Sequence, residues 1–394
     1  MLKSVAKIFS SHIVVKALGL FNVIIILSFF SVEEFGKYSY LLVLLHLVGV
    51  IIDPFLSAYF VDFKTYNYKK YNFGVLVLSF VLSFIFYFII YYLNNELTFS
   101  LFALFYFTFM IGTGLKSFLN AKEKYFNYGL VDVIRQLSIF VSTLLYFYLF
   151  SSENYIFLLE LNFALSLISI IILFIVFVDK NEIHFDFRFL TLKTLTLNSK
   201  FLILHIAILP FVAFIDSYFV EKYLTGQDLG LYSFSLKVYS ISLLLFAPIL
   251  TVLNVKQIEI AKEKSYLLFL KKNLKKVFVL STILLIVVVI INLVITQYVY
   301  LDYKNSFLDT SILLLAAYVS YISMPFSFLI AYRKYKQLFF LGISGIGINI
   351  LVNFLFIEKY GTTTAAFSTF FAQLVINFGS AILSYILLKS NHEV

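Results

Sequence analysis

The sequence predicts an all-α, polytopic membrane protein of about twelve transmembrane helices in two parallel six-helix lobes. Three observations predict this class. First, the 394 residues are 62% apolar and only 13% charged, whereas a soluble domain has about 45–50% and about 25%. Second, apolar runs near the ~20 residues needed to cross a bilayer recur along the whole chain. Third, a segment of the first half matches a segment of the second half in residue type and spacing.

Each long apolar run predicts a spanning helix, because in lipid a segment has to satisfy its own backbone hydrogen bonds. The twelve predicted spans are 8–30, 38–61, 73–93, 97–119, 129–150, 155–178, 201–219, 231–254, 277–300, 308–331, 338–356 and 364–388.

The basic residues predict the orientation of these spans. Of the 30 Lys and Arg residues, 22 fall in the termini and in every second connection, and four fall in the other connections. Positively charged loops stay in the cytoplasm. We therefore expect both termini in the cytoplasm and the chain in a membrane that borders it. The net charge of +9 follows from this asymmetry, so no nucleic-acid partner is needed to explain it.

The sequence gives no indication of catalytic chemistry. It contains no cysteine, so it has no Cys-ligated metal site. It also lacks a P-loop and a Gly-x-Ser-x-Gly motif, which an ATPase or a serine hydrolase of those types would carry. The longest predicted outer loop is 220–230, which is too short to house an active site. We expect a secondary transporter with no cofactor and no metal, not an enzyme.

An internal repeat appears when the chain is offset by 194 residues. Identical residues then coincide in six pairs: Gly36 with Gly230, Tyr38 with Tyr232, Ser39 with Ser233, Leu42 with Leu236, Pro54 with Pro248 and Leu56 with Leu250. The offset equals six spans, and an even number preserves orientation, so the halves are parallel repeats. We expect an N-terminal lobe at 1–190, a C-terminal lobe at 191–394 and a central cavity between them.

Three motifs resemble those of Wzx-type polysaccharide (O-antigen and capsule) flippases of the multidrug/oligosaccharidyl-lipid/polysaccharide superfamily. The stretch 31–39, SVEEFGKYS, resembles the acidic-x-Gly-x-Tyr signature after the first helix of that family. In the second half, Asp216 followed by 227–233 resembles the seventh-helix aspartate and the same Gly-x-Tyr element. The stretch 358–366 resembles the Gly- and Ala-rich start of the last helix.

The resemblance implies a flippase that moves an undecaprenyl-diphosphate-linked oligosaccharide from the inner to the outer leaflet by alternating access. Its partners would be the lipid-linked oligosaccharide, membrane lipids and other polysaccharide assembly proteins. The family commonly has Arg after the seventh-helix Asp, whereas this chain has Ser217, so the role of that Arg does not carry over.

Cations inside the spans are the candidates for binding the substrate. An ionisable residue in the membrane is costly unless it is paired or hydrated. A lipid diphosphate crossing hydrocarbon requires cationic partners. Lys16, Arg135 and Lys237 lie well inside predicted spans. The alternatives are structural: Lys16 and Arg135 pairing with Asp53 or Asp132, and Lys237 pairing with Asp216 as an ion pair or gate.

Four further residues are candidates for a coupling ion or a gate, and four prolines for hinges. Possible Na⁺ or H⁺ coupling would use carboxylate or imidazole groups; the candidates are Asp53, Glu160, Asp216 and His46. Proline removes a backbone donor and kinks a helix; the candidates are Pro54, Pro248, Pro210 and Pro325. The bending is either static or part of alternating access.

Two other functions stay open at this stage. A MATE-like cation or drug antiporter would share the fold but would favour an acidic, apolar cavity, whereas the buried cations favour an anionic cargo. A membrane glycan polymerase or ligase would need a sizeable external loop. Finally, the lysine-rich stretch 255–276 suits an amphipathic helix on anionic lipid.

Overall fold

The computed structural model describes residues 2–62, 71–94, 96–122, 124–150, 154–178, 185–186, 200–201, 204–205, 207–208, 210–263 and 266–390. It divides into two compact units, Met1–Ile203 and Leu204–Val394. The lobe boundary that the sequence predicts, at 190 and 191, lies outside the described residues.

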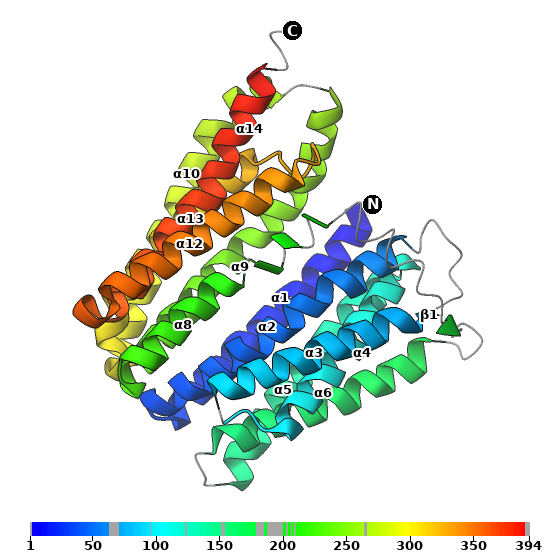
Figure 1. Ribbon diagram of the computed structural model, residues 1–394, viewed down its shortest axis with the longest axis vertical. Coiled ribbons are helices and arrows are strands. Elements are labelled where there is room, and N and C mark those ends of the chain that lie inside the picture. The colour runs from blue at the N-terminus through cyan, green and yellow to red at the C-terminus, as the bar shows by residue number, and fades with distance from the viewer. Residues whose placement is uncertain are drawn as a thin grey trace. The chain divides into compact units, whose positions relative to one another are not determined.

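The N-terminal unit contains six long helices (Figure 1). They are α1 (Leu2–Phe29), α2 (Val32–Asp62), α3 (Phe73–Leu93), α4 (Phe99–Ala121), α5 (Tyr125–Leu149) and α6 (Tyr155–Phe177). Helix α1 packs on α5, α5 packs on α6, and α4 packs on both α2 and α6. Polar caps set two of the helix starts. Thr98 accepts a hydrogen bond from Leu101 N at 3.2 Å, and Asn154 accepts from Ile156 N and Phe157 N at 3.1 Å each.

The C-terminal unit contains the other six helical spans. They are α8 (Phe211–Tyr223), α9 (Gly226–Glu263), α10 (Tyr266–Val294, extended by the π-helix η2, Ile295–Val299), α11 (Phe307–Ser323), α12 (Tyr335–Tyr360) and α13 (Thr362–Gln373), which runs through the π-helix η5 (Leu374–Phe378) into α14 (Gly379–Ser390). Short 3₁₀ turns, η3 (Leu301–Ser306) and η4 (Met324–Phe326), flank α11. The all-helical prediction of twelve spans is therefore confirmed.

Two elements of two residues each were not predicted. The strands β1 (Tyr71–Asn72) and β2 (Phe185–Asp186) pair in parallel, with Tyr71 opposite Phe185. They join the segment before α3 to the segment after α6, within the N-terminal unit. A pair this short leaves the all-α class unchanged.

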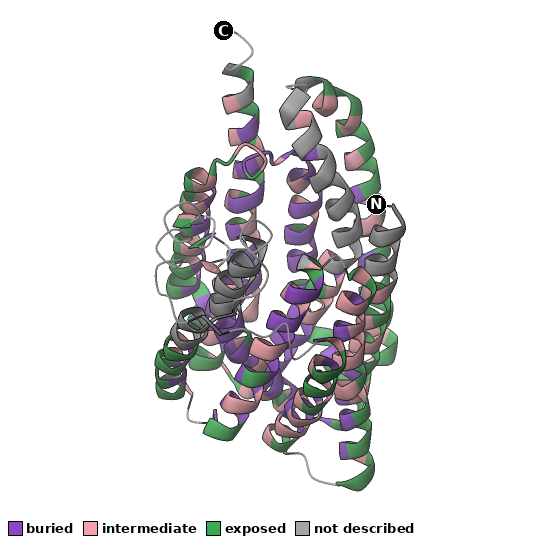
Figure 2. Ribbon diagram, turned by 90° about the vertical axis from the view of Figure 1, so that its right-hand side faces the viewer, coloured by how far each residue is buried: buried purple, intermediate pink, exposed green. Residues whose placement is uncertain are grey.

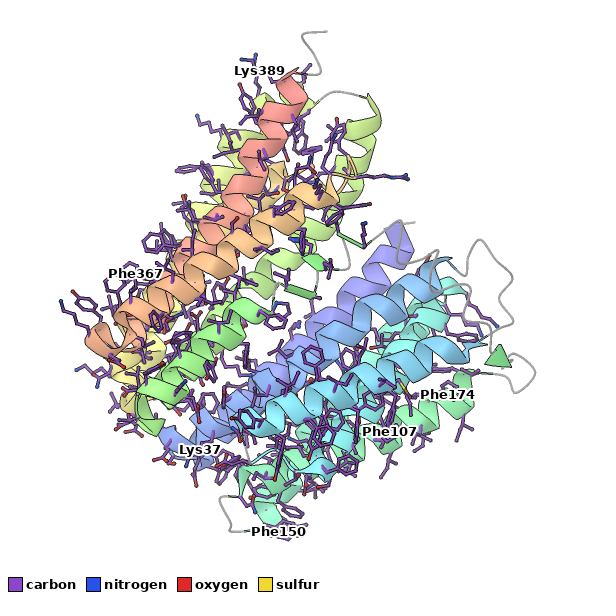
Figure 3. All side chains as sticks on the ribbon, viewed as in Figure 1. Lys37, Phe107, Phe150, Phe174, Phe367 and Lys389 are labelled. Carbon is purple, nitrogen blue, oxygen red and sulfur yellow. The ribbon has the colours of Figure 1, made fainter. Side chains whose placement is uncertain are left out.

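The helices are long and apolar enough for a multi-pass membrane protein. Among the described residues, seven helices meet the length and hydropathy expected of a membrane span, and two further apolar helices are shorter. Within each unit, buried, intermediate and exposed residues alternate along the helices (Figure 2). Phe107 and Phe367, labelled in Figure 3, are 42% and 43% exposed, as expected of side chains that contact lipid.

Two of the four prolines, Pro210 and Pro325, lie at the ends of α8 and α11, whereas Pro54 and Pro248 lie within α2 and α9. Pro210 is a turn residue directly before α8, and the described residues 200–201, 204–205 and 207–208 ahead of it are helical, so Pro210 interrupts the predicted span 201–219. Pro325 lies in η4, directly after the end of α11 at Ser323, eight residues before the predicted end at 331. Both positions follow from the missing N–H and fixed φ of proline. The side chains of Pro54 and Pro248 lie outside the described residues.

Equivalent capping boxes open the second helix of each unit. Ser31 N donates to Glu34 Oε2 at 3.1 Å, and Glu34 N donates back to Ser31 Oγ at 3.3 Å. Thr225 N donates to Asp228 Oδ2 at 3.1 Å, and Asp228 N donates back to Thr225 Oγ1 at 3.2 Å. These pairs satisfy helix N-terminal donors reciprocally. They are 194 residues apart, so the repeat seen in the sequence is also a repeat of local structure.

Candidate functional site

A cluster of charged side chains lies within the N-terminal unit, on α4 and α5. Asp132 on α5 is 7% exposed. Lys116 on α4 donates to Asp132 Oδ2 at 2.6 Å, and Arg135 Nη2 lies 3.5 Å from Asp132 Oδ1. Lys116 also lies 4.8 Å from the ring centroid of Tyr128. One buried carboxylate thus contacts two cations from neighbouring helices.

Lys16 on α1 belongs to the same cluster. It interacts electrostatically with Asp132, Arg135 and Lys116. Lys16 is itself an exposed residue. The face of α1 one turn further on lies against α5, because a Cβ on Gly19 would be 3.7 Å from the Gln136 amide. The cluster, defined as Lys16, Lys116, Asp132 and Arg135, therefore contains three cations and one anion.

The cluster answers one question that the sequence left open. Arg135 contacts Asp132, which was the structural alternative, but the single carboxylate is already hydrogen-bonded to Lys116. Arg135 keeps a side chain that is 35% exposed. Arg135 thus contacts Asp132 and still has a partly exposed side chain. A role for Lys16 and Arg135 in substrate binding stays a prediction.

Asp216 is the centre of a polar cluster in the C-terminal unit. It lies on α8 and is 0% exposed. Five neutral side chains donate to its carboxylate: Asn349 (2.8 Å), Asn353 (2.7 Å) and Ser368 (2.5 Å) to Oδ1, and Tyr232 (3.0 Å) and Thr369 to Oδ2. These donors come from α9, α12 and α13. Together they satisfy a negative charge that the burial would otherwise make very costly.

The predicted Asp216–Lys237 ion pair is wrong. Within the described residues the ion pairs involve Lys37, Lys116 and Arg135, and neither Asp216 nor Lys237 takes part in one. The reason is helical geometry. Tyr232 and Lys237 are five residues apart on α9, so their side chains diverge by about 140°. Because α9 turns Tyr232 toward Asp216, it turns Lys237 away.

Two amide oxygens give the Asp216 cluster unused ligand capacity. Asn349 Oδ1 and Asn353 Oδ1 are buried and have no hydrogen-bond partner in the described part of the chain. Rotating either amide by half a turn exchanges its nitrogen and oxygen. Carboxylate, amide and hydroxyl oxygens would then converge, which is the ligand set that hard cations take.

The repeat relates this cluster to a site without a carboxylate. At the 194-residue offset, Asp216 corresponds to Asn22 and Tyr232 to Tyr38. Asn22 and Tyr38 are both buried, and Asn22 Oδ1 has no partner among the described residues. The two units therefore share a polar position on their first helix, but only the C-terminal unit has an anion there.

The remaining candidates lie apart from these clusters. Glu160 on α6 accepts hydrogen bonds from Thr98 Oγ1 at 3.0 Å and from Ser100 Oγ, and so ties α6 to the start of α4. His46 on α2 contacts the carbonyl oxygen of Leu42 through Nδ1 at 2.9 Å. The side chain of Asp53 lies outside the described residues. Coupling or gating roles for these three residues stay predictions.

The neutral donors around Asp216 were missed by the sequence reasoning. Asn349 and Asn353 are four residues apart in an apolar helix, and that spacing puts them on one face. Ser368 and Thr369 follow in the next helix. An amide pair at helical spacing inside a membrane span was the signal that could have identified a partner for Asp216.

Comparison with known proteins identifies the fold. No family model matches the sequence, and no curated protein matches it. Among solved structures, one described as "Lipid II flippase MurJ, inward closed conformation" has a TM-score of 0.74 at 16% identity and covers 99% of this chain and 92% of its own. An inward-facing multidrug resistance MATE family transporter of the MOP superfamily has a TM-score of 0.72 at 10% identity, covering 99% of both chains.

A third structure has the same fold with a different described role. It is a MOP superfamily transporter from Pyrococcus furiosus whose description reports reverse polarity of the binding pocket and suggests a different function. It has a TM-score of 0.59 at 11% identity, covering 98% of this chain and 96% of its own. The chain therefore shares the fold of these three structures over nearly its full length.

Proposed function

We propose that this chain is a flippase that moves an undecaprenyl-diphosphate-linked oligosaccharide, such as an O-antigen or capsule repeat unit, from the inner to the outer leaflet of the bacterial cytoplasmic membrane by alternating access. The observation that carries the proposal is the excess of two positive charges in the cluster of Lys16, Lys116, Asp132 and Arg135. A lipid diphosphate carries a complementary charge, and desolvating it without cationic partners is prohibitive.

The residues of the cluster would contact the diphosphate in different ways, according to their chemistry. Arg135 offers a planar, forked guanidinium that suits two phosphate oxygens, whereas Lys16 offers a mobile point charge. Asp132 acts as a positioning residue, because it holds Lys116 and Arg135 by one carboxylate. Lys237 is a third candidate contact, and its lack of an ion pair within the described residues leaves its charge for an anionic ligand.

The comparisons support a lipid-linked cargo without specifying it. The fold is shared with a structure described as a lipid II flippase, and the sequence motifs resemble those of polysaccharide flippases. Membrane lipids and other polysaccharide assembly proteins are the partners that this function implies. The proposed activity is the export of a glycan without hydrolysis or group transfer.

Glycan export by point variants tests the proposal. Arg135→Ala and Lys16→Ala should each lower export by about thirtyfold or more, because losing one charged contact to phosphate costs about 2 kcal/mol or more. Arg135→Lys should retain part of the activity. Lys37→Ala is the matched control, since Lys37 pairs with Glu33 at 2.8 Å at the start of α2, away from the cluster. The readout is surface glycan, normalised to protein in the membrane. Full export by both alanine variants would contradict the proposal.

One observation favours a second candidate, a MATE-like cation or drug antiporter. The C-terminal unit holds the buried anion Asp216, which an antiported cation would require. Uptake of a cationic dye by proteoliposomes, compared with translocation of a lipid-linked glycan by the same vesicles, separates the two. Dye transport that Asp216→Asn abolishes and Arg135→Ala leaves intact would favour the antiporter.

In the flippase, Asp216 would serve the coupling ion. A cation bound among Asp216, Asn349, Asn353, Ser368 and Thr369 would tie α8, α12 and α13 together. A cation gradient could then bias the transport cycle through the difference in cation affinity between the two states, which sets the limit of any such shift.

A further inference from the structure

Seven exposed basic residues gather at one end of the C-terminal unit. Four lie in the first turns of α10 and three lie where the chain enters α12: Lys271, Lys272, Lys275, Lys276, Arg333, Lys334 and Lys336. We call these residues the basic end. Within the described residues none of them forms an ion pair, so no described acidic side chain neutralises their charges.

Aromatic packing fixes the two segments of the basic end together. Tyr266, at the first residue of α10, packs on Phe328 with ring centroids 4.7 Å apart. Phe269 packs on Phe328 at 5.9 Å, and Tyr332 joins the same hydrophobic cluster. Tyr332 directly precedes Arg333, so the start of α10 and the turn before α12 carry their cations side by side.

The lysines of α10 lie on an exposed face of the helix that is also apolar. At 100° per residue, the four lysines occupy an arc of about 140°. The same arc contains apolar side chains further along the helix that are 47–55% exposed: Val279, Ile283, Ile286 and Ile290. The most apolar window of this helix is only 17% buried. One stripe of α10 therefore runs from exposed apolar residues to exposed lysines.

Arg333 holds its cation in an unusual backbone conformation. Its φ is +55°, and among the described residues it is the one non-glycine residue with positive φ. The turn is closed by Lys334 N, which donates to Leu329 O at 2.7 Å. Glycine is the residue that ordinarily fills such a position, because a Cβ is unfavourable there. The chain places an exposed arginine where the backbone alone would favour glycine.

We propose that the basic end binds the phosphate headgroup of an anionic phospholipid whose acyl chains lie along the apolar stripe of α10. A phospholipid is the ligand that has both parts: a negative headgroup for the lysines and Arg333, and hydrocarbon for the stripe. A basic segment at the membrane surface attracts anionic lipid in this way. Neither a soluble anion nor a nucleic acid would account for the apolar half of the surface. The site is separate from the Lys16–Arg135 cluster and does not depend on the cargo.

A single introduced cysteine makes the site measurable, because the chain has no cysteine of its own. Leu268 is 72% exposed and lies within the arc of the four lysines. Leu268→Cys, labelled with a fluorophore and reconstituted into vesicles, would be quenched by brominated phosphatidylglycerol or brominated phosphatidylcholine at equal mole fraction. We expect several-fold stronger quenching by the phosphatidylglycerol.

Charge variants decide whether the basic end causes that preference. Replacing Lys271, Lys272, Lys275 and Lys276 by Gln should bring the ratio of the two quenching efficiencies close to one, and replacing them by Arg should keep it. A label at Tyr298→Cys, in η2 at the other end of the helix about 45 Å away, is the control and should show a much smaller preference. Equal quenching by both lipids at Leu268→Cys would overturn the proposal, as would a preference that survives the Gln variant.

Discussion

Asp216 is a single carboxylate on which three other helices converge. Five neutral donors satisfy its charge, and no lysine or arginine pairs with it within the described residues. A carboxylate in this position can hold a cation without first releasing a salt bridge. Its repeat counterpart, Asn22, offers an amide and no charge, so cation affinity is expected of the C-terminal unit only.

Thermal stability in different salts tests the Asp216 cluster. We predict that Na⁺ raises the unfolding midpoint of the native chain relative to K⁺ at equal ionic strength, because a ligand of the folded state contributes about 2.7 kcal/mol at 100 times its Kd. Asp216→Asn should lose this salt dependence. The measurement is the fraction of protein that stays monodisperse on size exclusion after heating. The chain has no Trp for intrinsic fluorescence and no Cys for a thiol-reactive dye.

Asp309→Asn is the matched control for that measurement. Asp309 is also buried, at 3% exposed, and it accepts a hydrogen bond from Thr363 at 2.8 Å. Asp309→Asn should lower the unfolding midpoint but keep the stabilisation by Na⁺. An equal Na⁺ effect in Asp216→Asn would exclude the cluster as the cation site. If the native midpoint follows pH and not Na⁺, and Asp216→Asn follows neither, the coupling ion is the proton.

At this scale the sequence revealed charges but not their partners. Lys16, Arg135 and Asp216 stand out because ionisable groups are rare and costly in membrane spans. Asn349, Asn353, Ser368 and Thr369 do not, because neutral polar residues are common at helix contacts in membranes. The predicted partner Lys237 was chosen for its depth. The depth of a residue in the membrane does not say in which direction its side chain points around the helix axis. Lys237 has a depth similar to that of Asp216 but points away from it.

Local sequence chemistry determines where the helices begin and end, whereas packing against other helices determines the π-helical turns within them. The capping boxes at Ser31–Glu34 and Thr225–Asp228 and the proline at 210 are visible in the sequence and set where helices begin. The π-helices η2 and η5 were not predicted, because they depend on contacts with other helices. In η5, Asn377 Nδ2 donates to Ser320 Oγ at 2.8 Å and to Gln373 Oε1 at 2.6 Å.

Two glycines of α12 test how closely the last helix packs on it. A Cβ at Gly345 would lie 2.6 Å from Ile376 Cγ1 and 3.1 Å from the carbonyl oxygen of Ala372, whereas a Cβ at Gly347 would meet nothing within 4 Å. We predict that Gly345→Ala lowers the free energy of unfolding by about 1–3 kcal/mol through overpacking. Gly347→Ala, on the same helix, should be neutral or stabilising by up to about 1 kcal/mol.

Heating each variant and measuring the monodisperse fraction on size exclusion gives the comparison. The contact at Gly345 includes backbone, which moves less readily than the end of a side chain. Equal midpoints for the two alanine variants would show that α12 and η5 separate freely enough to admit a methyl group. A close contact there would make this pair of helices a rigid element during transport.

At the scale of the whole molecule, most of the fold prediction rests on the internal sequence repeat. Six coincident residue pairs predicted two parallel six-helix lobes, and the structure has twelve helical spans in a fold shared with the MATE and MurJ structures. The parallel pair β1–β2 could not be predicted, since two residues carry no strand pattern. The substrate is also not encoded in the fold, because structures described as drug transporters and as a lipid II flippase share it.

The orientation of the chain rests on its charges, and cysteine labelling tests it directly. Lys304 lies in η3 before α11, and Lys336 lies at the start of α12 beyond it; both are exposed. The positive-inside rule assigns Lys336 to the cytoplasm and Lys304 to the outside. Each single substitution to Cys removes one charge from a bias of 22 to four, so the variants should keep the native orientation. A membrane-impermeant maleimide should label Lys304→Cys in intact cells and Lys336→Cys only after permeabilisation. The reverse pattern would place both termini outside, and the cationic cluster would then face a cargo arriving from the opposite leaflet.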